Sequence, residues 1–538
     1  MSPAMSDFAT VWEKLPADVA NGLLLSAAGE ARLMWLGERL LGAAGASPDP
    51  CLFSVLAHMV LSAWECSPLS PGIASHVHAL QKKQSFLRPQ PAAFSAVCAG
   101  LRPENSSGSE EVRACIQAGD AETAKKLTSA YADREPKNLY WLHFASFLGI
   151  RMGELDWYEP WIARYPMPAA FSLFFLADYA FAREDYAKAA ALYAQSFILS
   201  AMPEGLVREG ECLFRMGDRD AAGDRLRKAI VLRPWQSNLL LRLADIESGA
   251  DIPGDQPPGR GEVLIYSWNN GSALEQCLTA LAASRAGNYG FTVLNNGSTD
   301  NTPDVLRSKR ELFGERMRVI TLPVNIGSPA ARNWLLSLES SRAADWVVFL
   351  DDDALVPPDW VGFFGTAVRR HPDAGIIGCR VVDGIAPLAL QSVGLFLETN
   401  KEGKYKFIDD HVNSADFGLN SYLRRAISVT GCCHLLSRQN IDSVGAFDLS
   451  FSPSQYDDAE RDLRSCSQGE FCLYQGHLRV RHCKRRAFSL PTPWQQVNVM
   501  GNELKLWASY PEATLAAIMQ KYLRRLKDDF VRAAEECL

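Results

Sequence analysis

The sequence predicts an α/β domain built on a mainly parallel sheet and preceded by an all-α solenoid. Three observations support this prediction. A short motif recurs at residues 119, 153, 184 and 217, that is, at intervals of 34, 31 and 33 residues. A segment rich in proline and glycine, Ser248–Glu262, follows the motif. After it, short apolar runs alternate with amphipathic segments, an order typical of parallel strands joined by crossover helices.

The composition is that of a globular protein with more than one domain. The chain has 538 residues, of which 47% are hydrophobic and 22% charged, and its formal net charge is −7. This charge argues against a nucleic-acid binder that neutralises phosphates. The 13 cysteines include no Cys-x-x-Cys pair, which favours reduced thiols over a disulfide framework or a zinc module.

No targeting or membrane segment is evident. The amino-terminal residues lack the basic flank and apolar run of a signal peptide. The most apolar stretch, residues 22–46, is interrupted by Glu30, Arg32, Glu38 and Arg39, so it does not predict a transmembrane helix. We expect a cytoplasmic protein without a transmembrane segment, and peripheral attachment to the inner membrane is left open.

Residues 1–110 predict an N-terminal helical region, and residues 111–247 predict helical repeats. The recurring pairs are Gly119-Asp120, Gly153-Glu154, Glu184-Asp185 and Gly217-Asp218. Small residues follow at helix-packing positions: Ala124, Ala189, Ser196, Ala222 and Ala229. This pattern resembles tetratricopeptide repeats, helix-turn-helix units that stack into a solenoid. An irregular helical bundle is the alternative.

Residues 248–261 predict a linker, residues 262–490 the α/β domain and residues 491–538 C-terminal helices. Within the α/β domain, polar clusters follow four successive predicted strands. They are Ser267–Ser272, Asn295–Thr302, Asn325–Asn333 and Asp351–Asp353. Ligands of parallel sheets bind beyond the carboxyl ends of the strands, so we expect these clusters to form one rim.

From residue 262 to about residue 485 the chain resembles the family 2 glycosyltransferases. The elements that carry the resemblance appear in the family's order: "VLIYSWNN", "VLNNGSTDNT", "NIGSPAARN", "FLDDDALVPPDW", "GAFDLSF" and "YDDAERDLR". The resemblance implies a nucleotide-diphospho-sugar-binding fold with a Rossmann-like nucleotide-binding half. It also implies transfer of a sugar from such a donor, with UDP-type donors favoured, to an acceptor hydroxyl.

By this resemblance, Asp351 and Asp353 match the outer acids of the family's DxD motif. Alternate side chains of an extended chain share a face, so both carboxylates would meet the nucleotide and a metal. Mn²⁺ or Mg²⁺ suits oxygen ligands and a diphosphate. Asp352 would shape the turn beside the nucleotide-sugar, and His482 resembles a histidine that completes the metal site in related transferases. A solvated acidic turn is the alternative.

Further donor-binding residues follow from the same motifs. They are Ser267, Asn269, Asn295, Asn296, Asp300, Asn325 and Arg332. Asn295 replaces the aspartate that usually accepts a hydrogen bond from the base; an amide oxygen can accept the same bond. Asp300 has a second interpretation as the cap of the helix that follows it. Lys484, Arg485 and Arg486 form a cationic segment suited to a diphosphate.

For the catalytic base, the resemblance assigns Asp458, the second acid of an E-D-type motif. One carboxylate must take the proton of the acceptor hydroxyl as its oxygen attacks the anomeric carbon, and a single displacement inverts that centre. We interpret Glu460 and Asp462 as members of a charged, solvent-facing helix.

The helical repeats favour a protein as acceptor or partner, because solenoids bind extended segments. An acceptor in cell-surface polysaccharide or lipid-linked glycan is the second possibility. Two other classes remain: an interaction scaffold with an inactive transferase domain, which the Asn295 substitution favours, and a nucleotidyltransferase. The last would need a basic, glycine-rich phosphate loop that "SWNNGS" lacks.

Overall fold

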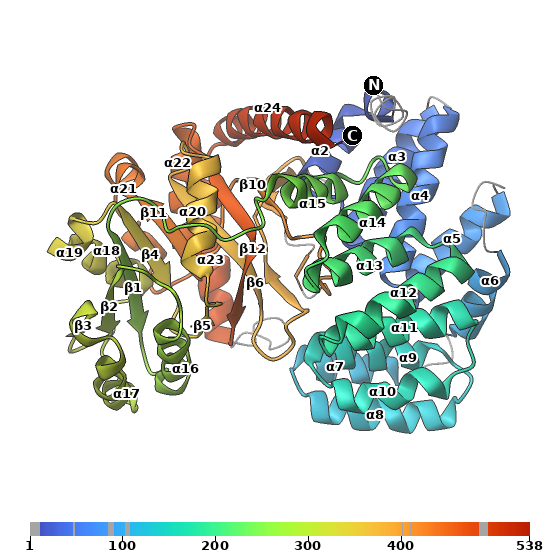
Figure 1. The fold of residues 1–538 in the computed structure, drawn as a ribbon, viewed down its shortest axis with the longest axis horizontal. Helices are drawn as coiled ribbons and strands as arrows, with labels where there is room; N and C mark the ends of the chain where they lie inside the picture. The colour runs from blue at the N-terminus through green and yellow to red at the C-terminus, as the bar shows by residue number, and fades with distance from the viewer. Residues whose placement is uncertain are drawn as a thin grey trace.

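The computed structural model describes residues 11–46, 49–83, 91–102, 108–400, 402–408, 411–412, 414–483 and 493–537. Helices fill one side of the molecule, and a sheet with flanking helices fills the other (Figure 1). Across the described residues, no helix is both long and apolar enough to span a bilayer. The predicted cationic segment at Lys484, Arg485 and Arg486 lies outside the described residues.

The amino-terminal helices pack with the first repeats around one apolar core, which includes Leu36, Leu56, Trp141 and Phe174. The helices are α2 (Ala17–Leu25), α3 (Glu30–Ala46), α4 (Pro50–Cys66), α5 (Pro71–Lys83) and α6 (Pro91–Gly100). The next helices are α7 (Ser109–Gln117), α8 (Ala121–Arg134), α9 (Tyr140–Ser146), the π-helix η2 (Phe147–Arg151), α10 (Leu155–Arg164), α11 (Ala169–Ala182), α12 (Tyr186–Ser200), α13 (Pro203–Arg215), α14 (Arg219–Leu232) and α15 (Ser237–Ser248).

The four predicted repeat motifs are four turns of the same geometry. Gly119, Gly153, Glu184 and Gly217 have φ angles of 74°, 84°, 61° and 88°, in the left-handed region that ends helices. The following aspartate caps the next helix in three of them, where Asp120, Asp185 and Asp218 accept hydrogen bonds from Thr123, Lys188 and Ala221 N–H. The predicted small residues are buried at the helix contacts: Ala124, Ala189, Ser196, Ala222 and Ala229. The prediction of an all-α solenoid is therefore confirmed.

The sheet runs in the order β10-β12-β6-β11-β4-β1-β2-β3, with β5 beside β12 and β7 beside β6. Neighbours β4, β1, β2 and β3 are parallel, whereas β11 is antiparallel to β4 and β6. This confirms the predicted mixed, mainly parallel sheet. The strands are β1 (Gly261–Ser267), β2 (Gly290–Asn295), β3 (Met317–Thr321), β4 (Trp346–Leu350), β5 (Ala354–Leu355), β6 (Ile376–Asp383), β7 (Leu390–Ser392), β10 (Leu423–Ala426), β11 (Cys433–Ser437) and β12 (Cys472–His482). A separate ribbon pairs β8 (Leu397–Thr399) with β9 (Tyr405–Phe407).

Alternate residues of each central strand enter two cores, one on each face of the sheet. In β4, Val347 and Phe349 join one core, and Val348 and Leu350 join the other. The covering helices are α16 (Gly271–Ala282), α17 (Thr302–Lys309), α18 (Ser328–Ser337), α19 (Glu339–Arg342), α20 (Trp360–Arg370), α21 (Arg438–Val444) and α22 (Asp457–Ser467), with short 3₁₀ turns η3 (Arg310–Leu312), η4 (Gly314–Arg316) and η5 (Leu449–Phe451).

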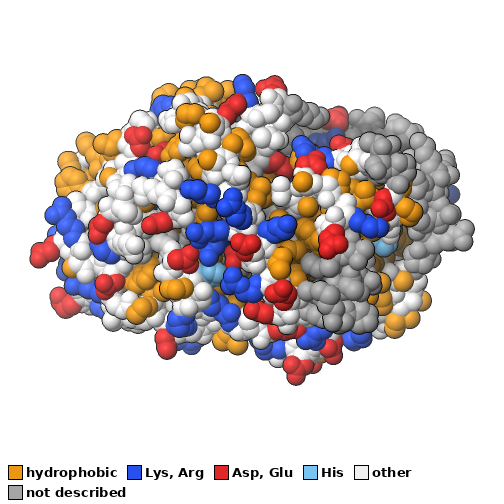
Figure 2. Space-filling view, turned by 90° about the horizontal axis from the view of Figure 1, so that it is seen from above, with side chains coloured by type: hydrophobic (Ala, Val, Ile, Leu, Met, Phe, Trp, Pro, Cys, Tyr) orange, Lys and Arg blue, Asp and Glu red, His pale blue; other side chains and the backbone are white. Residues whose placement is uncertain are grey.

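After the sheet come α23 (Pro493–Ser509), which stays on the sheet side, and α24 (Glu512–Cys537), which returns the chain to the helical side. The Phe530 ring of α24 lies 4.6 Å from the Trp12 ring. On the face seen from above, Lys and Arg side chains gather near the middle, with acidic side chains among them (Figure 2). The helical side is also joined to the sheet side by buried bonds: Arg424 Nη1 donates to Leu25 O over 3.1 Å, and Asn238 Nδ2 donates to Leu419 O over 2.9 Å.

Candidate active site

The loops that follow β1, β2 and β3 are joined by their own polar side chains. Asn269 Oδ1 accepts from Thr299 N–H over 2.7 Å. Asn296 Nδ2 donates to Asn325 Oδ1 over 2.9 Å, and Asn296 Oδ1 accepts from Ile326 N–H over 3.1 Å. The predicted rim is thus present, and these amides hold its loops together.

Asn295 ends β2 and is buried. Its amide oxygen accepts a hydrogen bond of 3.0 Å from Ser298 N–H, and its carbonyl accepts one from Leu322 N–H over 2.9 Å. A carboxylate at this position would make the same turn, so the replacement of aspartate by asparagine preserves the local backbone. Ser267, the last residue of β1, is also buried, and its carbonyl accepts from Asn296 N–H over 2.8 Å.

Asp300 connects two helix amino termini. One carboxylate oxygen accepts from Gly271 N–H at the start of α16, and the other accepts from Thr302 N–H at the start of α17, both over 3.0 Å. Burial opposes its ionisation, but the hydrogen bonds from Thr302 and Gly271 outweigh burial and hold the pKa of Asp300 below its usual value.

Replacing Asp300 by alanine is expected to lower the free energy of unfolding by about 1–2 kcal/mol, because two helix N–H groups lose their acceptor. Urea unfolding followed by circular dichroism measures the change. Asp304→Ala is the matched control, since Asp304 is exposed and pairs with exposed Arg307 in the same helix; we expect a change within about 0.5 kcal/mol. Equal losses in the two variants would contradict the capping role.

The three acids after β4 occupy different surroundings. Asp352 accepts from Asn270 Nδ2 over 2.8 Å, and burial together with Asp353 and Asp351 raises the pKa of Asp352 to about 7. Asp353 is buried and lies 2.8 Å from His482 Nε2, whereas Asp351 lies 3.7 Å from the same nitrogen. Asp351, Asp353 and His482 thus meet at one point, as the sequence predicts.

Two further residues complete this cluster, and sequence analysis does not assign them. Gln391 Oε1 lies 2.8 Å from His482 Nδ1, an arrangement that fixes the ring and directs Nε2 toward the acids. Cys432 offers a thiol whose sulfur lies within 4.8 Å of ligand atoms of Asp351 and His482. Cys432 directly precedes β11; Gln391 carries no sequence signal.

Asp457 and Asp458 begin α22 and have different partners. Asp457 is buried and accepts from Arg332 Nη1 over 2.7 Å. Burial works against the charge of Arg332, but the carboxylate of Asp457 outweighs it and raises the pKa of Arg332. Asp458 Oδ2 accepts from Gly431 N–H over 2.7 Å, and its Oδ1 accepts from Ala459 N–H over 2.9 Å.

The backbone between Gly431 and Cys432 joins the two acidic clusters. Asp351 N–H donates to Cys432 O over 2.9 Å, and the adjacent Gly431 N–H is the donor to Asp458. Asp351 and Asp458 therefore lie at the same edge of the sheet, where β4 ends and β11 begins, although they are far apart in the sequence.

The interpretation of Glu460 and Asp462 as solvent-facing is wrong. Glu460 is buried against Arg464, which donates to it over 2.7 Å. Asp462 is fully buried and accepts from Ser428 Oγ over 2.8 Å and Val429 N–H over 3.0 Å. Asp462 is covered by the loop before β11, whereas Glu460 also accepts over 3.1 Å from the Oη of Tyr510, between α23 and α24.

Comparison with known proteins assigns part of the chain to a protein family. Residues 262–430 match the family model described as glycosyl transferase family 2. Residues 262–430 are a family 2 glycosyltransferase domain. This segment holds the rim loops and the three acids after β4, whereas Asp458 and His482 lie beyond it and are positioned by α22 and β12.

Two curated proteins are similar to the region of the glycosyltransferase domain. O-antigen biosynthesis protein RfbC of Myxococcus xanthus is 25% identical over 236 residues, which are 43% of this chain and 17% of that protein. The uncharacterized glycosyltransferase YaiP of Escherichia coli is 31% identical over 144 residues, 26% of this chain and 33% of that protein. The chain therefore spans a third or less of these relatives.

Among solved structures, GalNAc-T7 with UDP, GalNAc and Mn²⁺ aligns with a TM-score of 0.39 and 12% identity, over 48% of this chain and 49% of that one. Mannosyltransferase PcManGT from Pyrobaculum calidifontis, in complex with GDP-Man and Mn²⁺, aligns with a TM-score of 0.35 and 14% identity, over 56% and 85%.

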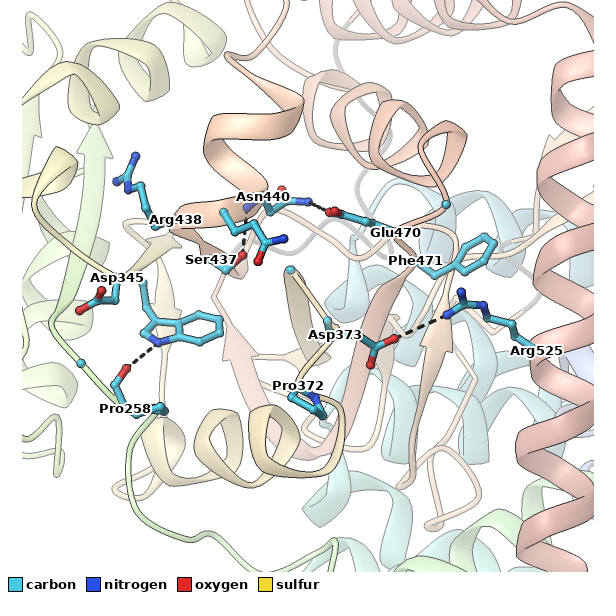
Figure 3. A pocket seen from close by; sticks show the side chains of 16 residues that line it. Pro258, Asp345, Pro372, Asp373, Ser437, Arg438, Asn440, Glu470, Phe471 and Arg525 are labelled. Carbon is cyan, nitrogen blue, oxygen red and sulfur yellow. Dashed lines mark hydrogen bonds and ion pairs between the residues drawn. The ribbon is translucent and has the colours of Figure 1, made fainter.

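The glycosyltransferase domain also has a cavity at the edge of its sheet opposite the acids. This cavity of about 670 Å³ lies where β4 and β6 begin (Figure 3). Its polar groups pair with one another: Asp373 lies 3.5 Å from Arg525, and Asn440 Nδ2 donates to Glu470 over 2.9 Å. These pairs leave little for a charged ligand to bind, so the acidic edge is the candidate active site.

Proposed function

We propose that the protein transfers a sugar from a nucleotide-diphospho-sugar to an acceptor hydroxyl, with a divalent cation and inversion at the anomeric centre. One observation carries the proposal. Asp351, Asp353, Asp458 and His482 come from β4, α22 and β12 and meet at one edge of a family 2 glycosyltransferase domain. At that edge, strand ends and loop amides form a rim suited to a nucleotide.

The acidic cluster fits a divalent cation. Asp353, Asp351 and His482 offer two carboxylates and an imidazole, a donor set that suits Mn²⁺ as well as or better than Mg²⁺. A bound cation would offset the charge of the departing diphosphate. Gln391 would hold the His482 ring in place, and Asn270 would hold Asp352 beside the donor.

Asp458 is the proposed base. Its carboxylate takes the proton of the acceptor hydroxyl while that oxygen bonds to the anomeric carbon and the bond from this carbon to the diphosphate breaks. Asp457 is unsuited to this role, because its charge is held by Arg332. The hydrogen bond from Gly431 N–H orients Asp458.

The helical repeats are proposed to hold a protein, since α7 to α15 stack as a solenoid next to the glycosyltransferase domain. This protein is either the sugar acceptor itself or an assembly partner. A second candidate is a sugar of a cell-surface polysaccharide, which the similarity to an O-antigen biosynthesis protein favours. Mass spectrometry of the transfer products formed with protein acceptors and with glycan acceptors separates the two candidates.

We expect one nucleotide class among UDP-, GDP- and dTDP-sugars, with UDP-sugars favoured, to raise the melting temperature in the presence of Mn²⁺. At a donor concentration of about 100 times Kd the stabilisation is about 2.7 kcal/mol. The effect should vanish in EDTA and in Asp353→Asn, and should persist in Asp304→Asn, which changes an exposed carboxylate on α17. Stabilisation of Asp353→Asn equal to the wild type would refute the assigned metal site.

A further inference from the structure

Another cavity lies between the helical repeats and the sheet, where Arg242 of α15 and His477 of β12 approach each other. Figure 1 shows the course of these two elements. The volume of the cavity is about 710 Å³, within the range of cavities that hold small organic ligands. Side chains of α13 and α15 line one wall, and side chains of β6, β12 and residues 355–357 line the other.

The cavity is rich in arginine. Arg215 and Arg242 come from the helical wall, and Arg380, Arg479 and Arg481 come from the sheet. Three of these arginines have carboxylate partners: Arg215 and Arg242 share Glu211, over 2.7 and 2.9 Å, and Arg380 binds Asp416 over 2.5 Å. Of the other acids in the lining, Asp251 is held by Arg219, and Glu184 is exposed.

Of the five arginines in the lining, Arg479 and Arg481 are the two that form no ion pair with a carboxylate among the described residues. They stand two residues apart on β12 and so share a face, with Arg479 directly opposite Arg380 of β6. Arg481 donates to Gly384 O, and across the described ranges Arg479 makes no hydrogen bond or ion pair. Burial, with Arg215 and Arg380 close by, lowers the pKa of Arg479 to about 10.

We propose that this cavity binds an organic phosphate, with its oxyanion on Arg479 and Arg481 and its body against Phe214, Val356 and Phe363. Guanidinium groups match the oxygens of a phosphate in a fork geometry, and a phosphate carries enough charge for two of them. Arg479 is half-buried and Arg481 is exposed, so an anion would give both cations a partner at the wall of the cavity. The apolar wall of the cavity gives the rest of the ligand a place to pack.

This site is separate from the donor site. His482, the neighbour of Arg481, turns to the opposite face of β12 and meets Asp353 there. The cavity therefore needs none of the acids that define the active site, and no divalent cation. Because its two walls come from the repeats and the sheet, a ligand would also bind these two parts together.

The test is isothermal titration of the full-length protein in EDTA with pyrophosphate, glucose 1-phosphate, farnesyl diphosphate and citrate. We expect one phosphate compound to bind, and Arg479→Gln/Arg481→Gln to weaken it at least ten-fold. Arg307→Gln, at an exposed ion pair on α17, and Asp353→Asn should bind as the wild type does. Tighter binding of farnesyl diphosphate indicates a lipid-linked phosphate, and tighter binding of glucose 1-phosphate indicates a soluble sugar phosphate.

Unchanged affinity in the double variant, citrate binding as tight as phosphate binding, or no binding of any compound would overturn the proposal. A second measurement does not depend on the variant folding. Phosphate binding should protect Arg479 and Arg481 of the wild type from modification by phenylglyoxal, mapped by mass spectrometry; equal modification with and without ligand would overturn the proposal too. Because Asp353→Asn serves in both tests, failure at the donor site and failure here are distinguishable.

Discussion

Asp458→Asn is expected to lower the rate of sugar transfer by about 10² to 10⁴ and to leave donor binding unchanged. The amide oxygen of asparagine can still accept the hydrogen bond from Gly431 N–H, so the loop before β11 stays in place. What is lost is the carboxylate that takes the acceptor proton, and general-base catalysis contributes about this factor. Single-turnover transfer rates, together with titration of the donor, measure the two effects separately.

The matched control is Asp442→Asn, an exposed aspartate on α21 whose ion pair with Arg438 lies on the surface. It should transfer at the wild-type rate. If Asp458→Asn did the same, the base would have to be another group. If it lost donor binding as well, Asp458 would belong to the donor site.

Arg332→Met is expected to lower the free energy of unfolding by about 3–5 kcal/mol. Arg332 and Asp457 form an ion pair whose side chains are 5% and 4% exposed, so removal of the cation leaves a carboxylate buried without its partner. The guanidinium also lies 5.1 Å from the Phe447 ring and 5.7 Å from the Tyr266 ring. Urea unfolding measures the loss.

A double variant tests the cause. Arg332→Met/Asp457→Leu removes both charges and should recover most of the stability, because a buried ion pair replaced by apolar groups of similar volume is often neutral. Arg307→Met, which breaks an exposed pair, should change stability by about 0.5 kcal/mol or less. A loss below about 1 kcal/mol in Arg332→Met would show that Asp457 finds water or another partner.

Local sequence patterns predicted the features that depend on neighbouring residues. The spacing of Gly119, Gly153 and Gly217 predicted turns that the structure builds with positive φ, and the same spacing placed Glu184 at an equivalent turn despite its side chain. Alternating apolar runs predicted the strands, and polar clusters after them predicted the rim. These properties are set within a few residues of chain.

Features that depend on distant parts of the chain were not predictable in this way. Asp462 looked like a surface acid, but its burial follows from the packing of α22 on the loop at Ser428. Gln391 approaches His482 only because β7 pairs with β6, next to β12. Asn296 and Asn325 looked free to meet a ligand, yet they bind each other across two loops.

The return of α24 to the amino-terminal helices has a consequence for folding. Phe530 contacts Trp12, so residues near both ends of the described chain stabilise one another, with the whole catalytic sheet between them in the sequence. The contact of Trp12 and Leu24 with α24 therefore exists only once this helix has docked. The amino-terminal helices should consequently reach their final stability only after α24 has been synthesised and has docked.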